Sequence, residues 1–306
     1  MWNTMLFPLL LLGVAGDAPK PGAADAVTAT ELNDLGVACF REARYTEAEA
    51  LYRRALATAE SSLGSGHLQV AFILSNLAAL EAAQGQYPSA EQHYRRALTI
   101  DGRGPEANPH LITVLNNLGN LYAAQARYRE AAECYQRALS QSVQHPDADE
   151  LLVATIRNNL GELYTQQNDL GKAEKLYRQA LAVREKRLGP THPNVATVLN
   201  NLAVLYRSQR KFSKAEQCLH RALLIRETAL GPEHPDVSIT LNNLAALLES
   251  QGRMQDAEPL LRRALEIRLK ANGPAHPEVG TGWNNLGQVL AARGEHVQAE
   301  RLLPNG

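Results

Sequence analysis

The sequence predicts an all-α fold, a solenoid of stacked helix-turn-helix repeats. The first observation is a pair of polar residues that returns along the chain, and its second members lie 42, 41, 42, 42, 42 and 42 residues apart. The second is that each copy contains two apolar stripes at helical spacing, separated by residues that break helices. One helical hairpin cannot bury its own stripes, so the copies must stack on one another. The recurring pairs are Asn33-Asp34, Ser75-Asn76, Asn116-Asn117, Asn158-Asn159, Asn200-Asn201, Asn242-Asn243 and Asn284-Asn285.

The fifth copy illustrates the two helices. A first stripe with i, i+3, i+4 and i+7 spacing ends at the polar break Ser208 to Lys211, and a second stripe follows it. The spacing therefore predicts two antiparallel helices joined by a tight turn. The first stripe consists of Leu199, Leu202, Ala203 and Tyr206, and the second of Ala215, Cys218, Leu219, Ala222 and Leu223.

Glycine and proline mark the ends of the predicted helices. The break within a copy contains Gly85, Asn168, Gly252 or Gly294 in four of the seven copies. The second helix runs into Leu188-Gly189-Pro190 and its copy Leu230-Gly231-Pro232, where glycine suits a left-handed end and proline cannot continue the helix. The first turn of a helix tolerates a residue without an amide donor, so we expect the next first helix to start at a proline. The prolines in question are Pro193, Pro235 and Pro277.

The periodicity divides the chain into a leader and seven repeats. We assign residues 1–18 to a signal peptide and 19–30 to a flexible linker, with the repeat array over 31–306. The repeats are 31–66, 67–107, 108–149, 150–191, 192–233, 234–275 and 276–306.

The assignment of a signal peptide rests on Met5 to Ala15, an uncharged apolar run followed by small residues. This is typical of a secretory signal, although no Lys or Arg precedes Lys20, and the run is too short to span a membrane. The alternative is a wrongly chosen start codon. We therefore expect a secreted or periplasmic protein if the signal operates and a cytoplasmic one otherwise.

Composition excludes several function classes. Lys and Arg number 31 against 32 Asp and Glu, so the chain lacks the basic excess of a general polyanion binder. Aromatic residues make up 5%, too few for a base-stacking platform. We therefore expect no nucleic-acid partner. No phosphate-binding loop, nucleophile elbow or HExxH spacing is present, so we also expect no enzymatic activity.

The repeats resemble a known family. Leu118, Gly119, Tyr122, Ala131, Tyr135 and Ala138 match the small and large positions of the tetratricopeptide pattern, and Trp283 occupies its tryptophan position. The 42-residue length and the segments Leu241 to Ala245, Arg221 to Glu227 and Leu230 to Pro235 resemble the repeats of kinesin light chains. The resemblance implies a right-handed superhelix whose first helices line a concave groove. Residues 1–30 lack the heptad segment of a motor subunit, so that role is not expected.

The groove supplies the candidate site. Amides at one position per repeat would form a row able to donate to and accept from the backbone of an extended peptide. The alternative is that these amides bond between adjacent helices and hold the stack together. The row comprises Asn76, Asn117, Asn159, Asn201, Asn243 and Asn285.

Specificity must come from groove positions that vary between repeats. One turn beyond the amides these are Asn120, Glu162, Val204, Ala246 and Gln288, with Arg207 and Glu249 nearby. This mixture of apolar and charged side chains is typical of a peptide-binding groove.

Histidines and cysteines predict neither a metal site nor a disulfide. Equivalent residues of successive repeats are too far apart to share a metal ion or a bond, because stacked helices lie about 8–10 Å apart. We expect the recurring histidines to cap helices and the three cysteines to be reduced core residues, with no cofactor. The histidines are His67, His192, His234 and His276, and the cysteines are Cys39, Cys134 and Cys218.

The sequence therefore predicts a non-enzymatic scaffold that binds a protein or peptide partner in its groove. A second hypothesis is a self-associating assembly protein that uses its terminal repeats. It rests on a poorly capped last repeat, whose apolar stripe would include exposed Leu286 and Leu290.

Overall fold

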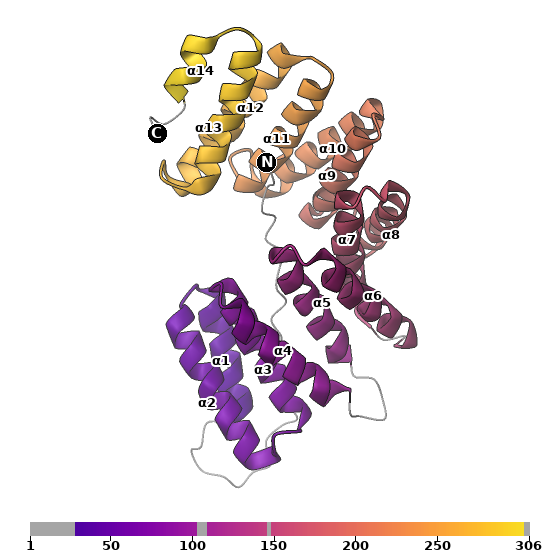
Figure 1. Cartoon of the computed structure of the whole chain (residues 1–306), viewed down its shortest axis with the longest axis vertical. Helices are drawn as coiled ribbons and strands as arrows, with labels where there is room; N and C mark the ends of the chain where they lie inside the picture. The colour runs from indigo at the N-terminus through magenta and orange to yellow at the C-terminus, as the bar shows by residue number, and fades with distance from the viewer. Residues whose placement is uncertain (1–27, 103–108, 146–147, 303–306) are drawn as a thin grey trace. The chain divides into compact units, whose positions relative to one another are not determined.

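Paired amphipathic segments of the chain form paired helices in the computed structural model, which describes residues 28–102, 109–145 and 148–302 (Figure 1). These residues form fourteen helices, two per repeat, and no strand. The fold is thus an all-α solenoid of stacked helix-turn-helix repeats. The helices are α1 (Ala29–Arg41), α2 (Tyr45–Leu63), α3 (Leu68–Ala83), α4 (Tyr87–Asp101), α5 (Pro109–Ala124), α6 (Tyr128–Gln144), α7 (Glu150–Gln166), α8 (Leu170–Leu188), α9 (Pro193–Ser208), α10 (Phe212–Leu230), α11 (Pro235–Ser250), α12 (Met254–Asn272), α13 (Pro277–Ala292) and α14 (His296–Leu302).

The helices belong to two compact units. Unit 1 covers Met1–Leu163 and unit 2 covers Tyr164–Gly306, so the division falls inside α7. In both units the first helix of a hairpin packs against its second helix and against the hairpins beside it. The assigned signal peptide and most of the assigned linker lie outside the described residues. No helix in the described part of the chain combines the length and the apolar character needed to cross a membrane.

Histidine caps begin four of the first helices, as the sequence predicts. The Nδ1 atom of each histidine accepts a hydrogen bond from the backbone N–H two residues later, at 3.1–3.3 Å. Proline follows three of these histidines, at a position where the missing donor costs nothing. The capped amides belong to Gln69, Asn194, Asp236 and Glu278.

The turns require a positive φ. Gly85, Asn168, Gly252 and Gly294 have φ between 61° and 82°, at the predicted breaks. The other three repeats place Ala43, Ala126 and Arg210 there at φ 57–58°, a conformation that costs a residue with a side chain about 1–2 kcal/mol. At the opposite end of the hairpins, Gly189 and Gly231 combine φ near 90° with ψ near 155°, a region open almost only to glycine.

Buried tyrosines fill the space between the two helices of a hairpin. Tyr52, Tyr94, Tyr135 and Tyr177 are 0–1% exposed and stand at the same position of the second helix in four successive repeats. In unit 1, Tyr52 packs on Gly36 and Tyr135 packs on Gly119. A Cβ atom at Gly119 would lie 2.5 Å from Cε1 of Tyr135, so a side chain there would force the tyrosine ring or the helix to move.

The cysteines are core residues, as predicted. Cys39 and Cys134 are buried, Cys218 is half-buried, and all three are free thiols. Burial raises the pKa of the Cys134 thiol to about 11, so this group is un-ionised and unreactive at neutral pH.

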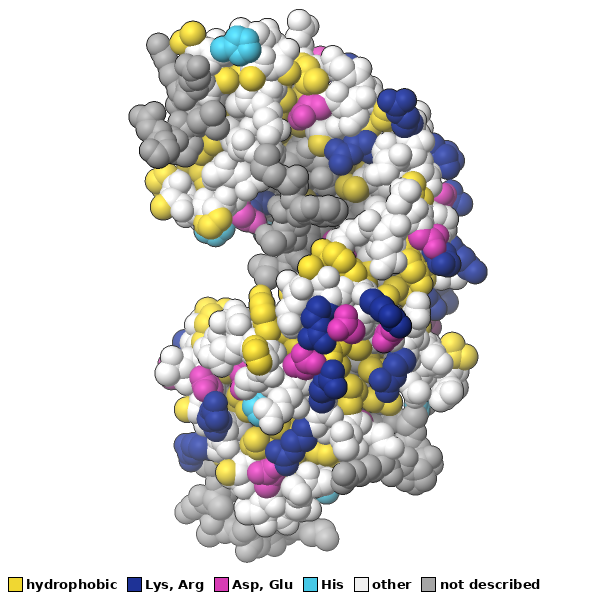
Figure 2. All heavy atoms as spheres, in the orientation of Figure 1, with side chains coloured by type: hydrophobic (Ala, Val, Ile, Leu, Met, Phe, Trp, Pro, Cys, Tyr) yellow, Lys and Arg dark blue, Asp and Glu magenta, His cyan; other side chains and the backbone are white. Residues whose placement is uncertain are grey.

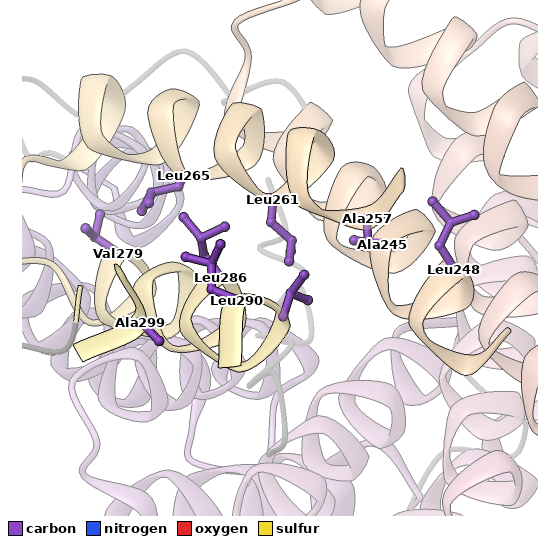
Figure 3. Packing of buried hydrophobic residues seen from close by; sticks show 10 residues of the cluster. Ala245, Leu248, Ala257, Leu261, Leu265, Val279, Leu286, Leu290 and Ala299 are labelled. Atoms are coloured by element: carbon purple, nitrogen blue, oxygen red, sulfur yellow. The ribbon is translucent and has the colours of Figure 1, made fainter. Parts of the chain in front are cut away.

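The last repeat is covered, which corrects the expectation that Leu286 and Leu290 form an exposed stripe. They are 1% and 0% exposed, in a cluster with Leu261 and Leu265 of α12 and Ala299 of α14 (Figure 3). The short α14 folds back over α13 and buries the stripe that the sequence leaves without an obvious partner.

Replacing Gly119 by alanine is expected to destabilise unit 1 by about 2–3 kcal/mol, because the tyrosine ring or the helix must move to relieve the clash. The matched control is Gly280→Ala on α13, where a Cβ atom meets nothing within 4 Å and alanine stabilises the helix by up to about 1 kcal/mol. Urea unfolding followed by circular dichroism measures both changes. Equal stability of the two variants would contradict this account of Gly119.

Candidate functional site

The first helices of successive repeats lie next to one another in each unit. In unit 1, α3 contacts both α1 and α5, and in unit 2, α11 contacts α9 (Figure 1). We call the surface formed by α1, α3 and α5 the first-helix face of unit 1, and that formed by α9, α11 and α13 the first-helix face of unit 2. The candidate residues of the sequence analysis lie on these helices and on α7.

The asparagines form a hydrogen-bonded ladder between repeats. At some junctions the second asparagine of a repeat donates from its Nδ2 atom to the Oδ1 atom of the first asparagine of the preceding repeat, 43 positions earlier. Three such bonds are Asn76 to Asn33 at 2.9 Å, Asn159 to Asn116 at 3.4 Å and Asn243 to Asn200 at 3.1 Å.

Further bonds hold the ladder in place. The Nδ2 atom of Asn200 donates to the carbonyl of Ala196 and to the Thr240 hydroxyl, each at 3.1 Å. In unit 1 the Oδ1 atom of Asn120 accepts from the Tyr135 hydroxyl at 2.6 Å and from Asn159 at 3.1 Å. These amides satisfy one another inside the stack, which is the alternative that the sequence left open.

Exposure separates the candidate amides into two groups. Asn76, Asn117, Asn120, Asn159 and Asn201 are at most 4% exposed. Asn243 and Asn285, both in unit 2, are half-buried and have a surface that a ligand can reach.

The variable positions of unit 2 lie one helical turn beyond the amides of the same helices. Val204 on α9 and Ala246 on α11 are half-buried and occupy equivalent positions, one turn beyond Asn201 and Asn243. Gln288 occupies the same position on α13 and is exposed. The face thus presents a small apolar strip beside a row of amides.

Arg207 and Glu249 add opposite charges next to this strip. Both side chains are half-buried. Burial lowers the pKa of Arg207 and the Glu249 carboxylate opposes that change, while burial raises the pKa of Glu249 and Arg207 opposes it. In both groups the effect of burial therefore outweighs the attraction of the opposite charge.

Glu162 is a third charged candidate, near the carboxyl end of α7. Burial raises the pKa of its carboxyl group to about 7. At neutral pH the residue therefore exists in both protonation states, and the charged state is disfavoured by the fold.

The second helices carry paired charges. Glu91 on α4 accepts from Arg95 four residues later and from Arg127 of the next repeat, and the Tyr122 hydroxyl also donates to it. Glu258 bonds to Arg262 and Arg293 in the same way. Figure 2 shows Lys and Arg side chains interleaved with Asp and Glu side chains on the face of unit 1 that is turned to the viewer. Each of these carboxylates is therefore neutralised by arginines of its own helix and of the next repeat.

Sequence reasoning missed two buried polar clusters of unit 1. Glu81, 1% exposed, accepts from Ser89 and lies 2.8 Å from Nδ1 of His93. Asp101 and His110 form a fully buried pair at 2.8 Å between α4 and α5. The sequence held one sign of the first cluster. Glu81 occupies the repeat position at which Tyr122 and Tyr206 stand in other repeats. Among the described residues, no three His, Cys, Asp or Glu side chains gather in a way that could hold a metal ion.

Loss of a ladder amide is expected to destabilise its unit. Asn200→Ala removes the acceptor of Asn243 and a partner of buried Thr240, and should cost about 1–3 kcal/mol. The control is Asn194→Ala, an exposed side chain on the same helix, with an expected change within about 0.5 kcal/mol. Thermal unfolding of both variants provides the comparison. A silent Asn200→Ala would show that the ladder bonds are dispensable.

Glu162 predicts a specific pH dependence of stability. Its pKa is higher in the folded chain than in the unfolded chain, so the folded state binds more protons. The stabilising contribution is complete below about pH 4.5 and is lost as pH rises to about 7. Glu162→Gln should therefore be more stable than the parent protein at pH 8, by about 1–3 kcal/mol, and equally stable at pH 4. Urea midpoints measured from pH 4 to 8 test this, and parallel profiles of the two proteins would refute it.

Comparison with known proteins agrees with this architecture. No curated protein matches the chain significantly. Among solved structures, BtubC (BKLC) from P. vanneervenii is 32% identical over 77% of this chain and 92% of its own, with a TM-score of 0.61. A putative kinesin light chain with nearly identical TPR-like repeats from Podosopora anserina is 22% identical over 64% and 93%, with a TM-score of 0.53. The quorum sensor NprR from B. thuringiensis is 14% identical over 90% and 74%, with a TM-score of 0.72.

The family model for the tetratricopeptide repeat matches residues 27–102, 110–186, 152–223, 195–270 and 236–303. These overlapping matches cover nearly the whole array of helical hairpins. The chain therefore belongs to the tetratricopeptide repeat family.

Proposed function

We propose that the protein is a non-enzymatic scaffold that binds an extended peptide segment of a partner protein on the first-helix face of unit 2. The observation that carries this proposal is the pair Arg207 and Glu249, two half-buried and incompletely compensated charges beside the apolar strip of Val204 and Ala246. Half-buried charges reduce stability unless a partner satisfies them, so they mark a surface adapted to binding.

The arrangement specifies the chemistry of the peptide. Asn243 and Asn285 can donate to and accept from a peptide backbone without reading its sequence. Val204 and Ala246 leave room for one aliphatic side chain. Arg207 and Glu249 select an acidic and a basic residue on either side of it, and repel peptides with the opposite order.

The other candidate amides have a supporting role in this proposal. Asn201 is 4% exposed, and Asn200 accepts from Asn243. The bond to Asn200 orients the amide of Asn243. In unit 1 the amides of Asn117, Asn120 and Asn159 are likewise enclosed, so we assign the partner peptide to unit 2.

A screen of random peptides against the full chain tests the proposal. The parent protein should enrich peptides with an aliphatic residue between an acidic and a basic one. The double exchange Arg207→Glu/Glu249→Arg keeps the charge balance of the face and should invert the order of the two charges in the enriched peptides. Each single exchange should weaken binding of the parent consensus by about 1–3 kcal/mol, or about 5- to 150-fold in affinity.

Two further variants separate binding from folding. Val204→Glu places a charge on the apolar strip and should abolish enrichment, whereas Ala182→Glu puts the same side chain on an exposed position of α8 and should leave it unchanged. Circular dichroism confirms that each variant is folded. A consensus that ignores the exchanges at Arg207 and Glu249 would refute the proposed face.

A further inference from the structure

Glu162 is a carboxylate that the fold partly encloses without giving it a partner. It lies on α7 within unit 1 and is half-buried. In the described part of the chain its side chain makes no hydrogen bond or ion pair. By contrast, the buried carboxylates Glu81 and Asp101 each pair with a histidine, and half-buried Glu91 pairs with two arginines.

The acid is peculiar to one repeat. The equivalent positions of the other six repeats hold neutral residues. The helices stack in those repeats without an acid at this position, so the fold itself does not require Glu162. The neutral residues are Val37, Ala79, Asn120, Val204, Ala246 and Gln288.

The polar groups around Glu162 are bonded to one another. Asn159 lies one turn earlier on α7, and its Nδ2 atom donates to Oδ1 of Asn116 at 3.4 Å and of Asn120 at 3.1 Å. The Tyr135 hydroxyl donates to the same Asn120 oxygen at 2.6 Å. Burial raises the pKa of Tyr135 and the charge of Glu162 raises it further, so the hydroxyl and the carboxylate lie near each other. These donors hold the ladder together, and none of them serves the carboxylate.

Glu162 is also the member of this group that a ligand can reach. Asn120 and Asn159 are 2% exposed and Tyr135 is 0% exposed, whereas Glu162 keeps part of its surface exposed. Burial is the cause that raises the pKa of its carboxyl group, and no neighbouring cation opposes the rise. A carboxylate in such surroundings attracts a cation more strongly than one in open water, because the local dielectric constant is lower.

We propose that Glu162 anchors a binding site in unit 1 for an organic cation, an ammonium or guanidinium group. Such a group brings the positive charge and the N–H donors that the site lacks. A divalent metal ion needs several protein ligands, and among the described residues no three His, Cys, Asp or Glu side chains gather. The cation belongs either to a lysine or arginine side chain of a partner or to a free amine. The site uses none of the residues that contact the partner peptide in unit 2, so the two proposals stand independently.

Binding at this site releases a proton. At neutral pH both protonation states of Glu162 are present, and only the carboxylate attracts a cation. When the cation binds to the neutral acid, the proton therefore passes to the solvent. Tyr135 of α6 is the ionisable group that faces Glu162, and its raised pKa keeps it neutral over this range. The affinity should fall by up to about tenfold for each pH unit below the Glu162 pKa of about 7, and level off above it.

Titration of the full chain with small probes tests the site. The cationic probes are acetyl-Ala-Lys-Ala-amide, acetyl-Ala-Arg-Ala-amide and n-butylammonium, and the neutral probes are the same tripeptides with norleucine or citrulline in the centre. Binding is followed by NMR through the side-chain amide signals of Asn120 and Asn159. The cationic probes should shift these signals and the neutral probes should not. Tighter binding of a tripeptide than of n-butylammonium would identify the cation as a partner's side chain, and equal affinity would identify it as a free amine.

Two variants isolate the charge. Glu162→Gln keeps the size of the side chain and should weaken binding of the cationic probes about 10- to 100-fold at pH 8. The matched control is Glu133→Gln on α6, an exposed carboxylate paired with Arg129, and it should leave the affinity unchanged. Circular dichroism at pH 8 establishes that both variants are folded.

Three results would overturn the proposal. Equal binding of charged and neutral probes, or no binding of any cationic probe, would show that the site does not recognise a cation. Undiminished binding to Glu162→Gln would place the cation elsewhere. An affinity that does not fall between pH 8 and pH 6 would show that the carboxylate of Glu162 is not the group that binds. The peptide screen on unit 2 is unaffected by any of these outcomes.

Discussion

The hydrogen bond from one side-chain amide to another, 43 residues earlier, is the constraint on which the rest of the array depends. It joins the first helices of successive repeats, and it is buried between Asn76 and Asn33 and half-buried between Asn243 and Asn200. A buried amide left without a partner is costly, so each bond fixes the register of one repeat on the next. Once the register is fixed by these residues, the neighbouring positions on the same helices can vary without loss of the fold.

That freedom explains why two faces built from the same repeat differ in chemistry. The position that holds Arg207 in one repeat holds Glu249 in the next and Ala82 in unit 1. These positions lie in a helix in each repeat, so the side chains alone determine the charge that each face presents. Function in such an array therefore depends on a few residues per repeat, while the remaining residues maintain the stack.

Much of the fold could be predicted because its signals are local. The 42-residue period, the histidine caps and the glycine turns each depend on a few adjacent residues, and all appear in the structure. The candidate site was harder to predict. The bond from Asn243 to Asn200 depends on how two repeats approach one another, and the bond from Tyr135 to Asn120 depends on how the two helices of one hairpin pack. The burial of Leu286 and Leu290 likewise depends on where α14 folds, which no periodicity in the last repeat indicates.

The turns inside the hairpins make some repeats less stable than others. Ala43, Ala126 and Arg210 hold a backbone conformation that glycine adopts without cost at the corresponding turns of repeats two, six and seven. In a chain where each repeat contacts only its neighbours, such differences are not averaged over the whole molecule. Local opening should therefore begin at the first, third and fifth hairpins, so that the protein loosens in segments of about one repeat rather than as a single body.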